Sequence, residues 1–308
     1  MVPAAPLVNV AVNDRVATIT IDRPAALNSI NPAVVHQFEL ALAGVEADPA
    51  IHGIVIAGAG KAFVVGADIE FFVRNIVADD IDRIVKFTAA GQRLLNAIDQ
   101  CPKTVVARVD GAAWGAGTEI ALACDFVVAT PQASFALPET SLGIYPGLGG
   151  TQRSSRALGV GIAKWLIYTG KILSAADAWK IGLIAQVAAR ERLDEFCALL
   201  ASGRAACESR PAMTPELVAL ADFFARTRVD DILANRADTS GNPALERAMK
   251  QAAGKSPLAL RLAEKLIDAG VTVSLAEGLQ MELSHLVEIF NDPMAQSLLR
   301  ARAKQSAD

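Results

Sequence analysis

Residues 104–125, TVVARVDGAAWGAGTEIALACD, decide the fold class, because a strand pattern, a glycine-rich turn and a helix pattern follow one another there. The run 104–109 is a short apolar stretch of the kind that forms a buried strand. The glycines of 111–117 predict a turn, and the apolar residues through Cys124 predict a short helix. This succession is typical of a strand-to-helix unit in an α/β protein.

Further strands and helices alternate on both sides of this unit. We expect a hairpin of residues 7–12 and 16–22, because two alternating apolar runs meet there at a short turn, Asn13-Asp14. A helix should begin at Pro32, with Asn31 as its N-cap. The remaining expected elements are strands at 53–57, 126–129 and 134–136, and helices at 32–45 and 81–98.

The second half of the chain has a different pattern. From about Thr151 helical periods dominate, with one strand-like piece at 184–188. Residues 204–255 are polar, alanine-rich and interrupted by prolines, which indicates an inserted helical or mobile segment. Strong helix patterns follow at 257–269 and 274–290. The expected organisation is a core at 1–200, an insert at 201–256 and a helical region at 257–308.

Composition and charge exclude several classes of protein. The 308 residues are 52% hydrophobic with a net charge of −4, so neither a disordered chain nor a basic nucleic-acid-binding protein is expected. The four cysteines form no CxxC pair and the three histidines are isolated, which predicts no disulfide framework and no metal site. We expect no signal peptide and no membrane span, and therefore a cytoplasmic protein.

Two carboxylates in apolar surroundings are the candidates for chemistry. Glu119 lies near the start of the helix that follows the glycine-rich turn, beside Ile120 and Leu122. Glu139 follows Pro138 in a second apolar stretch. A carboxyl group in such surroundings has a raised pKa, which suits a general acid near neutral pH. Helix capping is the alternative for Glu119, and spacing alone does not decide between the two.

A second glycine turn lies at residues 60–70, GKAFVVGADIE, where a strand pattern leads into a helix. Backbone N–H groups at the start of a helix have no intrahelical partner and can receive an anion or a developing oxyanion. An ordinary strand-to-helix turn is the alternative. The stretch is therefore a candidate site only in combination with the two carboxylates.

Together these stretches resemble the crotonase (enoyl-CoA hydratase/isomerase) family. The resemblance covers about residues 7–200 and resumes at 257–290, and it implies an α/β fold, a crotonase-like spiral of ββα repeats with a helical C-terminal trimerisation region. The residues that carry it are Asp22-Arg23-Pro24 with Asn28, KAFVVGADI at 61–69, ARVDGAAWGAGTEIALACD at 107–125 and PETSLGIYPGLGGTQR at 138–153.

The resemblance implies an acyl-CoA thioester as the ligand and hydration of a 2-enoyl-CoA as the reaction, in fatty acid metabolism. Backbone N–H groups of Ala67 and Ala116 would form an oxyanion hole, and Glu119 and Glu139 would hold one water between them. It implies no metal, no cofactor besides the coenzyme A of the substrate, and a homotrimer or hexamer. The substrate-binding positions that it implies are Ala26, Leu27, Val65, Gly66, Asp68, Ile69, Gly115, Pro138, Gly147 and Lys304.

Two residues of the expected site depart from the family pattern. Ala116 stands where glycine is common, and the oxyanion hole would be distorted if this position required a positive φ. Val65 stands where a small alanine is usual and would narrow the acyl path. The alternatives to a hydratase are a Δ3-Δ2 enoyl-CoA isomerase, an acyl-CoA hydrolase on the same scaffold and a non-catalytic acyl-CoA-binding subunit.

Overall fold

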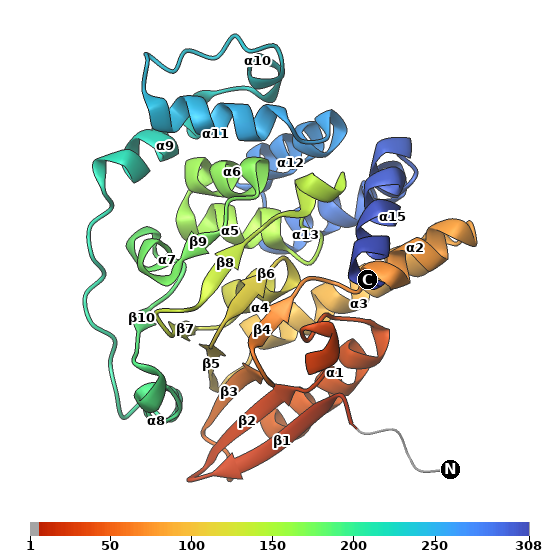
Figure 1. Ribbon diagram of the computed structural model, residues 1–308. Helices are drawn as coiled ribbons and strands as arrows, with labels where there is room; N and C mark the ends of the chain where they lie inside the picture. Colours follow the sequence, from red (N-terminus) through yellow and green to blue (C-terminus); the bar gives the residue numbers. More distant parts are fainter. Residues whose placement is uncertain (1–5, 308) are drawn as a thin grey trace. The chain divides into compact units, whose positions relative to one another are not determined.

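The computed structural model describes residues 6–307 and confirms the predicted α/β class (Figure 1). The chain forms two units, each built from interleaved segments. The first unit comprises Met1–Ala67, Arg93–Phe135 and Leu173–Pro211, and the second comprises Asp68–Gln92, Ala136–Ile172 and Ala212–Asp308. The three-part organisation with boundaries after residues 200 and 256 stays a prediction.

The first unit contains a six-stranded sheet in the order β1-β2-β3-β5-β7-β10. Its first two strands are antiparallel, and the remaining neighbours are parallel. Parallel neighbours need crossover connections, which the alternating strand and helix patterns of the sequence provide. The strands are β1 (Val8–Asn13), β2 (Val16–Ile21), β3 (Gly53–Gly58), β5 (Thr104–Val109), β7 (Phe126–Ala129) and β10 (Gln186–Val187).

The predicted hairpin is confirmed, although its turn lies one residue later than expected. Asp14 and Arg15 form the turn, with φ values of 45° and 66°, and Asn13 still pairs with Val16. A two-residue hairpin turn of this kind requires a positive φ at both central positions, which aspartate tolerates. The sequence did not predict a turn at Asp14-Arg15, because arginine is not a typical residue for the second central position of such a turn.

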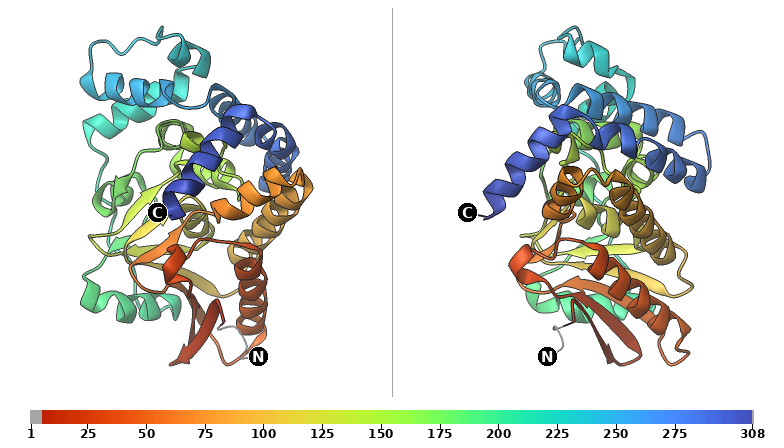
Figure 2. Two further views of the ribbon diagram at one scale, coloured as in Figure 1. Left: turned by 45° about the vertical axis from the view of Figure 1, so that its right-hand side comes forward. Right: turned by 90° about the vertical axis from the view of Figure 1, so that its right-hand side faces the viewer.

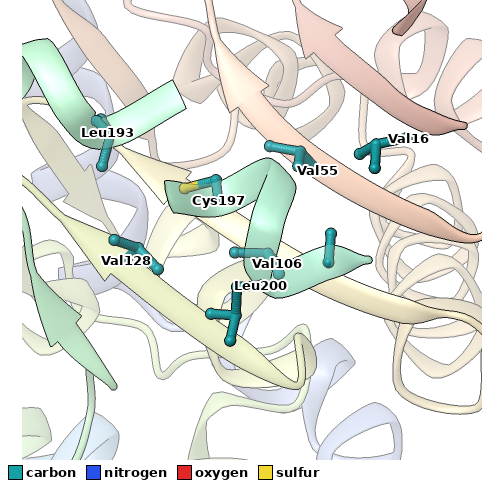
Figure 3. Close-up of a cluster of buried hydrophobic side chains, with 8 residues drawn as sticks. Val16, Val55, Val106, Val128, Leu193, Cys197 and Leu200 are labelled. Atoms are coloured by element: carbon teal, nitrogen blue, oxygen red, sulfur yellow. The ribbon is translucent and has the colours of Figure 1, made fainter. Parts of the chain in front are cut away.

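Helix α8 (Arg190–Ala201) covers one face of this sheet. Its residues Leu193, Cys197 and Leu200 pack against Val55 and other valines of the neighbouring strands (Figure 3). Residues of β3 that point to the opposite face are also buried. Burial on both faces explains why β3 and β5 have nearly continuous apolar sequences.

A second, smaller sheet has the order β4-β6-β8-β9. Only β8 was expected from the sequence: β4 and β6 lie inside glycine-rich stretches that predict turns, and β9 has only two residues. The strand-like piece at 184–188 is likewise reduced to the two residues of β10. The strands of the smaller sheet are β4 (Ala62–Val65), β6 (Ala112–Trp114), β8 (Ser134–Ala136) and β9 (Leu173–Ser174).

The other helices that begin within the first unit are short or lie near its edge. Helix α1 (Pro32–Ala47) begins as predicted, since the Asn31 side chain accepts a hydrogen bond from the Val34 N–H at 3.0 Å. Helix α4 (Ala116–Ala123) is the predicted helix after the glycine-rich turn. The remaining two are η1 (Pro24–Ala26) and α7 (Ala175–Ile181).

The second unit is helical. The expected helix at 274–290 is divided in two at His285, and its start is fixed by a capping box of Ser274 and Glu277. The polar stretch 204–255 forms three helices. The elements are α2 (Ile69–Val77), η2 (Glu139–Leu142), α5 (Gly150–Leu158), α6 (Val160–Thr169), α9 (Pro215–Arg226), α10 (Val229–Leu233), α11 (Pro243–Ala253), α12 (Pro257–Gly270), α13 (Leu275–Ser284), α14 (Leu286–Phe290) and α15 (Pro293–Ala307), with α3 (Ile81–Asp99) ending in the first unit.

Within the second unit, α15 lies beside α2, as two views of the ribbon show (Figure 2). A cluster of aromatic rings strengthens the packing of α2: Phe72 lies 5.1 Å from Phe290 and 5.9 Å from Phe87 between ring centroids. No helix within residues 6–307 is both long and apolar enough to cross a membrane.

We expect Leu193→Ala to lower the free energy of unfolding by about 2–5 kcal/mol, because it leaves a cavity between α8 and the sheet. Leu193 is fully buried. Urea unfolding followed by circular dichroism measures the change. Val12→Ala is the control, because Val12 is 59% exposed and its truncation should cost no more than about 0.5 kcal/mol. Equal losses in the two variants would contradict the role assigned to α8.

Candidate functional site

The predicted oxyanion donor Ala67 lies two residues after the end of β4, in a segment that hydrogen bonds hold at Val65 and Gly66. On one side, the Val65 N–H donates to the carbonyl oxygen of Leu27 at 3.0 Å. On the other side, the Gly66 N–H donates to the carbonyl oxygen of Trp114, at the end of β6, at 2.7 Å. The carboxyl ends of β4 and β6 are therefore joined where the candidate site begins.

Gly66 determines the direction of the Ala67 N–H. Its φ of 68° is a conformation that favours glycine. Its N–H points toward Trp114, whereas its carbonyl oxygen accepts a hydrogen bond from the Ile30 N–H at 3.0 Å on the opposite side. In a trans peptide unit the carbonyl and the following N–H point in opposite directions. The Ala67 N–H therefore points away from Ile30.

Ala116 occupies a position that does not require a positive φ, so the distortion expected for that case does not arise. The positive φ, 55°, belongs to Gly115. Gly117 is needed for a different reason, because a Cβ atom there would lie 2.1 Å from the carbonyl oxygen of Val64. Ala116, between them, is the first residue of α4 and is not among the residues with a positive φ. Its methyl group is compatible with this backbone.

The backbone N–H groups of Ala67 and Ala116 have one property in common, the lack of an acceptor within the described protein. The N–H of Ala116 belongs to the first turn of α4, where no intrahelical acceptor exists. The N–H of Ala67 is directed away from its neighbour Ile30. Among the residues that the structure describes, neither N–H donates a hydrogen bond to another protein group. Two donors at the ends of neighbouring strands are thus available to an external acceptor.

Glu119 lies one turn beyond Ala116 on the same face of α4, since residues three apart on a helix are neighbours. Its side chain is only 2% exposed, in agreement with the apolar sequence around it. The backbone there is regular, because the Glu119 N–H donates to the carbonyl oxygen of Gly115 at 3.0 Å. The catalytic role of Glu119 stays a prediction.

Glu139 belongs to the second unit and is the first residue of η2. Hydrogen bonds hold this short helix: the Thr140 hydroxyl donates to the carbonyl oxygen of Ile167 at 2.7 Å, and Lys255 Nζ donates to Ser141 Oγ at 2.9 Å. Burial lowers the pKa of Lys255. Helix α15 also packs against η2. Glu139 therefore sits on a backbone fixed by α6, α15 and the end of α11.

A buried carboxylate that sequence analysis did not single out organises the loop after η2. Glu282, fully buried on α13, accepts hydrogen bonds from the Gly149 N–H at 2.9 Å, the Thr151 N–H at 3.2 Å and Gln92 Nε2 at 3.0 Å. The same Gln92 group donates to the carbonyl oxygen of Gly147 at 2.9 Å. The predicted binding residue Gly147 thus lies in a loop held by two buried polar side chains.

The sequence carried a signal for Glu282. It lies three residues after Leu279 on α13, so an ionisable side chain occupies the apolar face of an amphipathic helix. Such a residue is rarely buried without several hydrogen bonds. Tyr145 adds a further link: its hydroxyl donates to the carbonyl oxygen of Glu282 at 2.6 Å, and burial together with the Glu282 charge raises its pKa.

The remaining predicted positions divide between the two units. Asp68 is the N-cap of α2, where its side chain accepts a hydrogen bond from the Phe71 N–H at 3.3 Å, and Lys304 is exposed in the last turn of α15. The first unit holds Ala26, Leu27, Val65, Gly66, Ala67, Gly115, Ala116 and Glu119, and the second holds Asp68, Ile69, Pro138, Glu139, Gly147 and Lys304.

A groove of about 740 Å³ lies elsewhere in the first unit, along β2 and α8. Val16, Thr18 and Leu199 line it, and the ion pair of Arg204 with Asp14 lies at its rim. None of the predicted site residues is among its lining residues. Within residues 6–307, no group of three or more His, Cys, Asp or Glu side chains is arranged to hold a metal ion.

Comparison with known proteins identifies the family. The sequence pattern of the enoyl-CoA hydratase/isomerase family matches residues 11–213, which is more than half of the chain. The chain belongs to the enoyl-CoA hydratase/isomerase family. This family member is 41% identical over 181 residues to a crotonyl-CoA hydratase of Syntrophomonas wolfei, covering 58% of this chain and 68% of the relative.

Other relatives agree with this assignment. A probable enoyl-CoA hydratase of Rhizobium meliloti is 41% identical to this family member over 203 residues, or 64% of this chain and 74% of the relative. The crystal structure of an enoyl-CoA hydratase from Rhodobacter sphaeroides matches with a TM-score of 0.85 at 26% identity, covering 97% of this chain and 90% of that one. A carnitinyl-CoA dehydratase from Mycobacterium thermoresistibile also gives 0.85 at 26% identity, with 96% and 89% covered. The crotonase fold is thereby confirmed.

We expect Glu282→Gln to lower the free energy of unfolding by about 2–4 kcal/mol, since hydrogen bonds to a charged group are worth about 1.5–3 kcal/mol each. Both carboxylate oxygens accept hydrogen bonds, so either orientation of the amide turns its NH₂ group toward N–H donors. Urea unfolding measures the loss. Glu288→Gln is the control, because Glu288 is half exposed and pairs with His285. A loss no larger than that of the control would contradict this account.

Proposed function

We propose that this chain is an enoyl-CoA hydratase, which adds water across the 2,3 double bond of a 2-enoyl-CoA thioester to give a 3-hydroxyacyl-CoA. The observation that carries the proposal is the pair of available N–H donors of Ala67 and Ala116, with Glu119 one helical turn away. The names of the relatives from Syntrophomonas wolfei and Rhizobium meliloti support the same reaction.

The two N–H groups act on the thioester carbonyl. Hydrogen bonds to its oxygen withdraw electrons from the conjugated double bond and make the β-carbon electrophilic. When water adds to that carbon, the electron pair of the double bond moves to the thioester oxygen, giving an enolate. Donors that are already directed at this oxygen stabilise the enolate without reorganisation, and the loss of one donor costs about 10²–10³-fold in rate.

The two glutamates move the protons. Glu119 takes a proton from the water as its oxygen bonds to the β-carbon, and Glu139 gives a proton to the α-carbon as the enolate collapses. The reaction consumes one water without a net change of oxidation state. It leaves Glu119 protonated and Glu139 ionised, and proton exchange through solvent returns both groups to their starting states. General acid–base catalysis of this kind contributes about 10²–10⁴-fold for each group.

The remaining predicted positions belong to the recognition of the coenzyme A thioester. They are Ala26, Leu27, Val65, Gly66, Asp68, Ile69, Gly115, Pro138, Gly147 and Lys304, and Val65 restricts the acyl chain. No metal and no cofactor besides the substrate's own coenzyme A takes part. The assembly is a homotrimer or a hexamer in the cytoplasm, and light scattering of the purified protein determines which of the two assemblies forms.

We expect Glu119→Gln and Glu139→Gln each to lower kcat for crotonyl-CoA by about 10²–10⁴-fold, because each amide can neither take nor give the required proton. Loss of the conjugated-thioester absorbance measures hydration. Glu216→Gln on the exposed surface of α9 is the control and should keep full activity. Full activity in both site variants would refute the mechanism. Product analysis separates the alternatives: a shifted double bond indicates an isomerase, and free coenzyme A a hydrolase.

Ala116→Pro tests the backbone donor directly. Proline removes the N–H but fits the first position of a helix, so α4 should remain intact. We expect kcat to fall by about 10²–10³-fold, as for the loss of one oxyanion donor. Ala175→Pro, at the first position of α7, controls for the general effect of such a substitution. An unchanged kcat in a folded Ala116→Pro variant would exclude this N–H from the reaction.

A further inference from the structure

We propose that Asn28 is a positioning residue that orients the Ala67 N–H for the reaction. The proposal rests on the proposed function in one respect only, that Ala67 donates to a thioester oxygen. Asn28 does not contact the substrate in the proposed mechanism. Its effect passes through the backbone of residues 28–30 and 65–67.

The Asn28 side chain is fully buried, and all of its polar atoms are used. Its Oδ1 atom accepts a hydrogen bond from the Arg23 N–H at 2.9 Å. Its Nδ2 atom donates to the carbonyl oxygens of Ala59 at 2.8 Å, Ala62 at 2.9 Å and Phe63 at 3.1 Å. One side chain therefore joins the loop that follows β2 to the turn after β3 and to the first two residues of β4.

The backbone of this loop is in an unusual conformation. Leu27 and Asn28 are consecutive non-glycine residues with φ values of 50° and 59°. Such left-handed conformations are unfavourable for most side chains, and asparagine tolerates them better than others. They persist only where the surroundings hold them, and the four hydrogen bonds of the Asn28 side chain supply that restraint. The Leu27 carbonyl is thereby presented to Val65, and the Ile30 N–H is presented to Gly66.

The Ile30 N–H transmits the effect to the site. It donates to the Gly66 carbonyl oxygen at 3.0 Å, and this carbonyl shares a rigid planar unit with the Ala67 N–H. Fixing one end of the unit fixes the direction of the other. The same hydrogen bond polarises the peptide unit, and hydrogen bonds in a chain strengthen one another. The Ala67 N–H consequently becomes a better aimed and stronger donor.

A purely structural role for Asn28 makes a different prediction. In that case its variants would lower stability and leave the chemistry of the folded enzyme unchanged. A positioning role lowers kcat in the folded enzyme, changes KM less, and alters the polarisation of a bound carbonyl. These readouts separate the two roles.

The test uses Asn28→Asp and Asn28→Gly in the full-length protein. The aspartate keeps the size and the Oδ1 acceptor but loses the donors to Ala59, Ala62 and Phe63; the glycine keeps the backbone conformation but loses all four hydrogen bonds. We expect kcat for crotonyl-CoA to fall by about 10–100-fold in both, less than for complete loss of a donor. KM should change by less than about threefold, because ground-state binding uses other contacts.

A spectroscopic readout keeps the proposal testable apart from hydration. The infrared C=O stretch of bound butyryl-CoA, labelled with ¹³C at the carbonyl, should shift to lower frequency in the wild-type protein and shift less in both variants. This measurement needs binding and no turnover, so it remains informative if the chain proves to be an isomerase or a hydrolase. If the wild-type protein binds butyryl-CoA without any shift, the proposed oxyanion hole fails and the role of Asn28 fails with it.

Asn242→Ala is the control, because it removes another asparagine whose side chain accepts hydrogen bonds, the half-buried N-cap of α11, far along the chain from β4. It should reduce thermal stability and leave kcat and the carbonyl stretch unchanged. The proposal is overturned if Asn28→Asp folds and keeps the wild-type kcat and carbonyl stretch. It is equally overturned if the Asn242→Ala variant changes both to the same extent.

Discussion

The hydrogen bond from the Gly66 N–H to the carbonyl oxygen of Trp114 is the contact on which the candidate site of the first unit depends. It joins the ends of β4 and β6, two neighbouring parallel strands, at the point where the backbone leaves the sheet after each strand. Neighbouring strands lie about 4.8 Å apart. The backbone groups that follow these strand ends, at Ala67 and Ala116, are the two that we propose to serve one oxygen atom.

Much of the fold could be predicted from the sequence because its strongest signals are local. The alternating runs of the hairpin, Asn31 before Pro32 and the apolar run of β5 each report their own secondary structure. β4, β6 and β9 were not predicted, because β4 and β6 lie inside glycine-rich stretches that indicate turns and β9 has only two residues. They exist through their pairing with one another, which is a property of the folded chain.

The residues of the candidate site likewise fall into those that the sequence predicts and those that it does not. Glu119, Glu139 and the two oxyanion donors could be named from motifs, because those stretches carry a family resemblance. Gln92 and the buried hydrogen bonds of Asn28 could not, since their partners lie tens to hundreds of residues away in the chain. Glu282 shows in the sequence only as a charged residue on the apolar face of its helix, which does not identify its partners. Such residues do not touch the reacting atoms. They hold the backbone segments whose N–H groups do. What marks them is the burial and hydrogen bonding of their polar atoms, which the three-dimensional structure reveals.

The alanine at position 116 has a consequence of its own. In the unfolded chain, an alanine explores far fewer backbone conformations than a glycine, so it loses less entropy when the first turn of α4 forms. A replacement of this type at a compatible position stabilises a protein by about 0.4–1 kcal/mol. The same restriction in the folded protein limits the range of directions that the Ala116 N–H can sample. With alanine at position 116, the N–H donor therefore has a narrower range of orientations than it would have with glycine.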